Sequence, residues 1–268
     1  MKSRTASILI GILAMVCLGL VFSVVYPFTT SDPHASVPQN EQMTTSDEDA
    51  FSANGSIVVD GEVALAFDGV VTADGAWYHR LVEGDMVSEA YQSSSNGTVY
   101  HRWRIEGGDE AEQRRESLTE KNDTEIVSEE RNGDRVTFII EENGTGSTEP
   151  VSGAASVIVN SLSVARYESE SADSSTDTIY KPQSGWYDEA ETYRLTDASG
   201  DIRADADTHV VKSANVSWDM TRPAGTYAEY VLARSLGEEP NTFRTTYEFD
   251  SGDTDLEQPT WVDEADST

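Results

Sequence analysis

The chain of 268 residues carries a formal net charge of −31, from 49 Asp and Glu against 18 Lys and Arg. Nucleic acid is excluded as an expected partner, because phosphate binding needs a basic face and the sequence shows none. A disordered acidic tail is also excluded, since 37% of the residues are hydrophobic and 9% are aromatic. The acids are scattered along the chain, which is typical of halophilic proteins whose carboxylates hold water and cations.

The first residues predict a membrane anchor. Residues 6–26 contain neither charge nor proline and would span about 31 Å as a helix, enough for a bilayer core of about 30 Å. Basic residues occur in residues 1–5, which we expect to stay in the cytoplasm. The membrane is thus an expected partner through residues 6–26, in a single-pass protein of the cell membrane with an extracellular C-terminal domain. A cleaved signal peptide is the alternative, although Val21 and Ser23 make a poor cleavage pair.

The segment after the anchor predicts a flexible polar stalk at residues 27–54, because it contains Pro33 and Pro38 and has no apolar period. The single cysteine, Cys17, lies in the apolar run, so no disulfide is expected outside the membrane. Asparagines with Ser or Thr two positions later are candidates for N-glycosylation, which fits an extracellular location. These candidates are Asn54, Asn96, Asn122, Asn143 and Asn215.

Residues 55–262 consist mainly of short β-like runs, which predicts one β-rich domain. The runs of the first half are residues 56–60, 62–67, 76–82, 86–92, 98–105, 125–130 and 135–141. Asn96-Gly97 and Asn132-Gly133 predict tight hairpins. The runs of the second half are residues 191–196, 202–204, 208–220, 225–233 and 242–249.

One clear helix interrupts these strands. Apolar residues recur at helical spacing from Val151 to Ala165, which predicts an amphipathic helix over residues 152–167. The remaining segments are a short exposed helix around residues 110–120, a loop at residues 168–177 and an acidic tail at residues 263–268.

The expected fold class is therefore mainly β, of the α+β type. We expect a curved antiparallel half-barrel sheet with one or more helices on its concave face, the main one at residues 152–167, because a large sheet needs a cover for its apolar side. The alternative architecture is a two-sheet sandwich, in which this helix would lie at one end.

The sequence does not indicate a catalytic centre. His79, His101 and His209 lack the spacing of zinc ligands, and no nucleophile elbow, phosphate loop or dinucleotide fingerprint occurs. The acidic stretches at residues 197–207 and 250–255 could supply calcium ligands, but they are better interpreted as hairpin turns in so acidic a chain. We therefore expect no catalytic residue, no metal and no cofactor, and a protein that is not an enzyme.

Aromatic residues are the more suggestive group. They form either an ordinary core or the wall of an apolar cavity for a lipid-like ligand, which a curved sheet forms if one helix cannot fill it. The residues expected to line such a cavity are Trp77, Trp103, Trp218, Tyr230, Ile158 and Leu162.

Several stretches resemble a known group of domains. Ser95-Asn-Gly-Thr-Val-Tyr-His-Arg-Trp103 is similar to the glycine turn and Tyr-x-Arg strand of lipoprotein-carrier-like domains, and residues 191–196 follow after the amphipathic helix. Residues 200–219 resemble their paired return strands, and residues 246–261 resemble their last strand, which closes with a proline. The chain thus looks like a haloarchaeal surface protein of the LolA/LppX/RseB-like lipoprotein-carrier superfamily. It departs from that pattern in having a single strong helix and a membrane helix in place of a lipidated cysteine.

The resemblance implies an eleven-stranded half-barrel that binds an acyl chain or a hydrophobic peptide segment. We therefore expect a membrane-anchored, extracellular, non-catalytic binding protein whose partner is a lipid or a hydrophobic segment of an exported protein such as a lipoprotein. The alternative is a ligand-free structural or sensory ectodomain with a fully packed interior.

The charge leads to a first testable prediction. Dilution from molar potassium chloride to about 0.1 M lengthens the screening distance from about 3 Å to about 10 Å, so the acids repel one another more strongly and the compact state is destabilised. Fluorescence emission of the five tryptophans should shift to the red as salt falls. An emission spectrum that stays unchanged over this range would contradict the halophilic interpretation.

Overall fold

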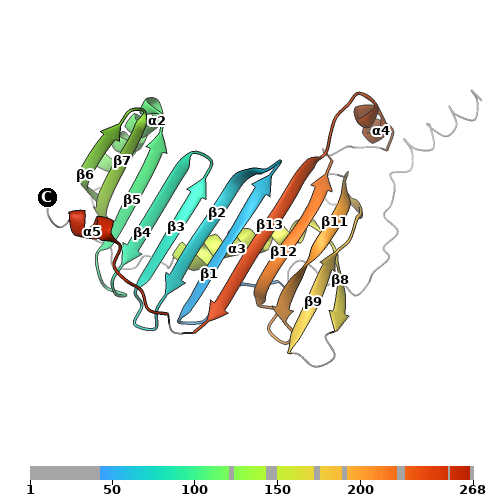
Figure 1. Ribbon diagram of the computed structural model, residues 1–268, viewed down its shortest axis with the longest axis horizontal. Helices are drawn as coiled ribbons and strands as arrows, with labels where there is room; N and C mark the ends of the chain where they lie inside the picture. Colours follow the sequence, from blue (N-terminus) through green and yellow to red (C-terminus); the bar gives the residue numbers. More distant parts are fainter. Residues whose placement is uncertain are drawn as a thin grey trace, which may run out of the picture.

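The structure is a computed structural model that describes residues 43–120, 124–142, 150–171, 176–188, 192–221, 227–252 and 254–265. Its strands form one open antiparallel sheet in the order β6-β7-β5-β4-β3-β2-β1-β13-β12-β11-β9-β8, and β10 pairs with β11 beside this path (Figure 1). The strands of the first half are β1 (Phe51–Val59), β2 (Glu62–Val71), β3 (Trp77–Glu83), β4 (Met86–Gln92), β5 (Val99–Glu106), β6 (Thr124–Asn132) and β7 (Arg135–Glu142). Those of the second half are β8 (Tyr167–Ser171), β9 (Asp177–Pro182), β10 (Gly185–Asp188), β11 (Thr192–Asp205), β12 (Val211–Met220) and β13 (Asn241–Ser251).

The helices are few and short: α2 (Gly108–Thr119), α3 (Pro150–Ser161) with a 3-10 turn at Leu162–Val164, α4 (Tyr227–Ser235) and α5 (Thr260–Ala265). The mainly β, antiparallel character of the chain is thereby confirmed. The sandwich alternative is wrong for the described residues, because every named strand belongs to a single sheet.

Several expected boundaries are corrected. The stalk was expected to extend to residue 54, but Phe51 already begins β1 with its side chain buried, and Thr44 pairs with Val210. Residues 168–177 were expected as a loop, yet they contain most of β8 and the start of β9. Residues 225–233 were expected as a strand, but good helix formers such as Ala228 and Leu232 lie in α4.

The acidic tail expected at residues 263–268 also needs correction. Its first residues, 263–265, belong to α5, and residues 266–268 lie outside the described part of the chain.

The two faces of the sheet are covered by different parts of the chain. α3 and α2 pack on one face, where the largest apolar cluster lies beneath α3 and a second cluster, which includes Phe138 and Leu118, lies beneath α2. The C-terminal segment crosses the opposite face, and its Trp261 and Val262 are buried against Tyr91 and Ile139 (Figure 1). We refer to these as the α3 face and the α5 face.

No helix in the described ranges is long and apolar enough to cross a bilayer. The expected anchor at residues 6–26 lies outside those ranges and stays a prediction.

Candidate functional site

The surface beneath α3 gathers most of the residues expected to line an apolar cavity. Trp77, Trp218, Ile158 and Leu162 belong to one cluster, and each is 3% exposed or less. Trp103 does not join them, since it is half-buried beside α2, with the Arg114 guanidinium 3.9 Å from its ring centroid. Tyr230 lies in α4, but its side chain is outside the described part of the structure. That the four clustered residues line a ligand cavity stays a prediction.

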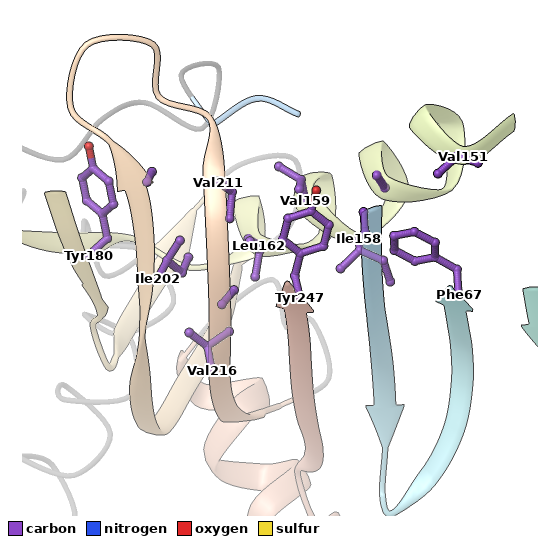
Figure 2. Packing of buried hydrophobic residues seen from close by; sticks show 14 of the residues in the cluster. Phe67, Val151, Ile158, Val159, Leu162, Tyr180, Ile202, Val211, Val216 and Tyr247 are labelled. Carbon is purple, nitrogen blue, oxygen red and sulfur yellow. The ribbon is translucent and has the colours of Figure 1, made fainter. Parts of the chain in front are cut away.

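Small residues in the central strands let α3 approach the backbone of the sheet. Strand pairing places Gly55 of β1 between Phe67 of β2 and Tyr247 of β13. The two rings lie 6.4 Å apart between centroids, and Ile158 of α3 enters between them (Figure 2). A Cβ atom on Gly55 would lie 3.3 Å from Ile158 Cγ2, so glycine keeps this slot open.

A second slot lies two residue pairs further along the same strands, on the same face. Ala53 of β1 pairs with Gly69 of β2, and Val151 from the first turn of α3 packs onto Gly69. A Cβ atom on Gly69 would lie 2.6 Å from Val151 Cγ1, closer than real Cβ contacts. α3 is therefore seated by two branched side chains, Val151 and Ile158, in two glycine-lined slots.

These slot residues were missed in the sequence because glycine and alanine add little to an apolar pattern. The weak signal was an alternation of apolar and small residues in β1, namely Phe51, Ala53, Gly55 and Ile57, which begins inside the segment interpreted as stalk.

α3 differs from the rest of the chain in lacking charge. Residues 150–165 contain no Asp, Glu, Lys or Arg, although a quarter of the whole chain is charged. Val157, on the outer side of the helix, is 52% exposed. A short helix containing Gly153 and β-branched residues has little stability of its own, so α3 depends on its packing against the sheet.

Three buried polar atoms on the α3 face have no hydrogen-bond partner among the described residues. They are the indole nitrogen of Trp218, the hydroxyl of Tyr247 and Nδ1 of His79. Burial raises the pKa of Tyr247 to about 12. Burial, and to a smaller extent the nearby His101, lowers the pKa of His79 to about 4. Buried polar atoms normally form hydrogen bonds, so a water molecule or a ligand oxygen bound at this interface would supply the partners that these atoms lack.

The α5 face carries a buried acid. The Glu89 carboxylate is 5% exposed and accepts hydrogen bonds from Tyr78 at 2.9 Å, from Arg102 Nε at 2.8 Å and from an Arg104 guanidinium nitrogen at 2.9 Å. Burial, followed by the Glu89 carboxylate, raises the pKa of the Tyr78 hydroxyl. Two arginines and a tyrosine thus fully occupy Glu89, which makes it a structural centre of this face.

Within the described ranges, no group of His, Cys, Asp or Glu is arranged to hold a metal ion. Asp205, from the acidic stretch at residues 197–207, instead accepts backbone hydrogen bonds from Asp207 and Thr208 in the turn between β11 and β12. These bonds lower the pKa of Asp205 to about 2. The interpretation of this stretch as a hairpin turn is confirmed at its C-terminal end, while residues 197–204 lie within β11.

The glycosylation candidates occupy different positions. Asn54, Asn96 and Asn215 are exposed, and Asn54 and Asn215 lie in strands that flank β13. Asn122 and Asn143 lie outside the described residues. Modification of any of them stays a prediction.

The packing of α3 on Gly69 yields a stability prediction. Gly69→Ala should lower the free energy of unfolding by about 1–3 kcal/mol, because the added methyl group collides with Val151. Gly153→Ala should raise it by up to about 1 kcal/mol, because that exposed helical position has open space around it. Urea unfolding in molar potassium chloride measures both changes. In a double-mutant cycle, Val151→Ala should lower the unfolding free energy less in the Gly69→Ala background than in the wild type. Purely additive effects would show that Val151 does not pack against Gly69.

The half-buried His79, whose Nδ1 atom is fully buried, yields a pH prediction. Its pKa is 6.5 in the ordinary state and about 4 in the folded protein, so between these values the unfolded chain binds a proton that the folded protein does not. Stability from the neutral imidazole is therefore present above pH 6.5 and is lost as the pH falls towards 4, by up to about 3 kcal/mol. The unfolding free energy of His79→Gln should lack this component. Equal pH dependence in the variant and the wild type would show that His79 is not buried in its neutral form.

Comparison with known proteins adds no family assignment. No family model matches the chain, and neither the curated proteins nor the solved structures give a match. The resemblance to lipoprotein-carrier domains therefore stays a prediction.

Proposed function

We propose that the chain is a non-catalytic binding protein of the cell envelope, which holds a lipid acyl chain or an apolar segment of an exported protein beneath α3. The observation that carries this proposal is the uncharged helix α3, seated by Val151 and Ile158 in two glycine-lined slots. The proposal includes membrane attachment through residues 6–26, an extracellular domain and a sheet that curves around α3 as a half-barrel.

The geometry supports α3 as an exchangeable cover. Branched apolar side chains fill the slots, so a branched or linear hydrocarbon chain has the right chemistry to replace them. α3 contains no charged residue and so forms no ion pair with the described residues, and its Ser156 hydroxyl is hydrogen-bonded at 3.2 Å to the Thr45 hydroxyl in the segment before β1. Moving such a helix would separate no charges.

The unpartnered polar atoms support the same proposal. The hydroxyl of Tyr247 lies beneath α3, and Trp218 lies in the neighbouring strand β12. An acyl chain carries a carboxyl or ester oxygen at its end, and a peptide segment carries backbone carbonyls. Either group could accept a hydrogen bond from the Trp218 indole or the Tyr247 hydroxyl.

A ligand-free structural or sensory ectodomain is the second candidate. It is favoured by the tight packing of the same cluster, in which Ile158, Leu162, Leu195 and Ile202 are fully buried. In this case α3 would be a permanent part of the core.

Ligand uptake separates the two candidates. The full-length protein, purified in detergent and molar potassium chloride, is tested with a fluorescent fatty acid and by native mass spectrometry for lipid that co-purifies. Ile158→Ala empties the slot over Gly55 and should raise uptake several-fold, whereas Val157→Ala on the exposed side of the same helix should behave as wild type. A wild type without lipid, together with no uptake by either variant, would favour the ligand-free ectodomain.

A further inference from the structure

The α5 face contains a pocket that is independent of the site beneath α3. Its volume is about 260 Å³, and it is lined by Arg80, Asp85, Val87, Arg104, Glu106 and Arg135. Strand pairing explains why these residues meet. Val87 of β4 is opposite Arg104 of β5, and Glu106 of β5 is opposite Arg135 of β7. The pocket therefore lies across four neighbouring strands, β3, β4, β5 and β7.

The charge of this pocket is opposite to that of the chain. Acids outnumber Lys and Arg by 49 to 18 over the whole sequence, but three arginines and two acids line the pocket. Its charged residues therefore carry a small positive excess inside a strongly negative protein. Arginines scattered over the surface would relieve the repulsion between the acids equally well. The grouping of three arginines at one pocket therefore indicates a function of that pocket.

The bonding of the three arginines leaves donors free. Arg135 pairs with Glu106, and Arg104 uses one guanidinium nitrogen to bind the buried Glu89. Nε of Arg104 is buried and has no acceptor, and Arg80 forms no ion pair with any described residue. Two acids lie directly opposite Arg80, namely Glu89 on β4 and Asp68 on β2. Glu89 is already occupied by Arg102, Arg104 and Tyr78, and Asp68 forms no ion pair with Arg80.

We propose that this pocket binds a small oxyanion, a phosphate, sulfate or carboxylate group, through Arg80 and Arg104, with Arg135 at its border. A planar guanidinium group donates parallel hydrogen bonds that match two oxygens of such an anion. The anion supplies the charge partner that Arg80 lacks among the described residues, and it binds the part of the Arg104 guanidinium that does not contact Glu89. The group belongs either to a free anion or to the headgroup of an anionic lipid, and this chemistry is the same for both.

The test uses inorganic phosphate as the probe. The full-length protein in molar potassium chloride is titrated with phosphate and, separately, with sulfate by isothermal calorimetry, at constant ionic strength. Arg80→Gln should weaken the affinity about tenfold or more, since it removes one charged donor pair. Arg80 is exposed and without an ion pair, so this variant should keep the thermal midpoint of the wild type in the absence of phosphate.

Arg244→Gln is the matched control. Arg244 is also exposed, lies in β13 and faces the α5 side by strand alternation, but it is not part of the pocket. It should bind phosphate as the wild type does. Equal weakening in both variants would show a general effect of surface charge and overturn the proposal, as would a wild type that binds neither phosphate nor sulfate.

Short-chain lipids distinguish the source of the anion, because the proposed anchor at residues 6–26 would attach the full-length protein to any vesicle. Calorimetric binding of dihexanoyl phosphatidylglycerol but not of dihexanoyl phosphatidylcholine, lost in Arg80→Gln and kept in Arg244→Gln, would assign the pocket to a lipid headgroup. Phosphate binding without binding of the short-chain phosphatidylglycerol would assign it to a free anion. The outcome does not depend on fatty-acid uptake beneath α3, so each proposal can fail alone.

Discussion

The approach of α3 to the backbone of the central strands is the contact on which the arrangement depends. A wide sheet exposes its apolar side unless another element covers it, and here the cover is a short helix that could not be stable alone. The absence of side chains at Gly55 and Gly69 brings that helix close enough for Val151 and Ile158 to fill the slots. Sheet and helix therefore stabilise each other, and neither has a complete core without the other.

The same sheet presents two different chemistries. On the α3 face, burial is almost wholly apolar, and three polar atoms, those of Trp218, Tyr247 and His79, have no hydrogen-bond partner among the described residues. On the α5 face, a buried carboxylate is held by two arginines, and an aromatic segment from the chain's end packs beside it, with Arg102 5.2 Å from the Trp261 ring centroid. Because side chains alternate along each strand, one set of strands specifies both surfaces. The proposed apolar site over β1, β2 and β13 and the proposed anion pocket over β3, β4, β5 and β7 therefore lie on opposite faces and share no residue.

Much of the fold could be predicted from the sequence. Clean alternation in residues 98–105 and helical spacing from Val151 onward identified β5 and α3, because in both cases one face is buried and the other is not. The edge strand β8 was missed because Glu168 and Glu170 face solvent and give no apolar pattern. α4 was mistaken for a strand because its tyrosines and valine resemble β-formers.

The candidate sites were harder to predict. Three of the five strand residues that form the slots are glycine or alanine, and such residues matter through the space they leave, which an apolar pattern in the sequence does not show. The pocket of the α5 face depends on strand order, since Arg80 and Arg135 are far apart in sequence and are brought together by the pairing of β3, β4, β5 and β7. Residue pattern alone carries no information on such neighbours.

The position of β13 has a consequence for how the chain folds. Strands β1–β7 pair among themselves, as do β8–β12, and β13 joins the two groups by pairing with β1 on one side and β12 on the other. Phe51 thereby meets Ser251, almost the whole length of the domain away. Bringing these distant segments together lowers the conformational entropy of the chain before the stabilising contacts between β1 and β13 have formed, and this slows folding. Until β13 arrives, the two half-sheets expose their inner edges at β1 and β12, and an exposed edge can pair with another molecule. The last of the described strands to be synthesised is therefore the one that covers both inner edges, and the chain is open to aggregation through these edges until it does so.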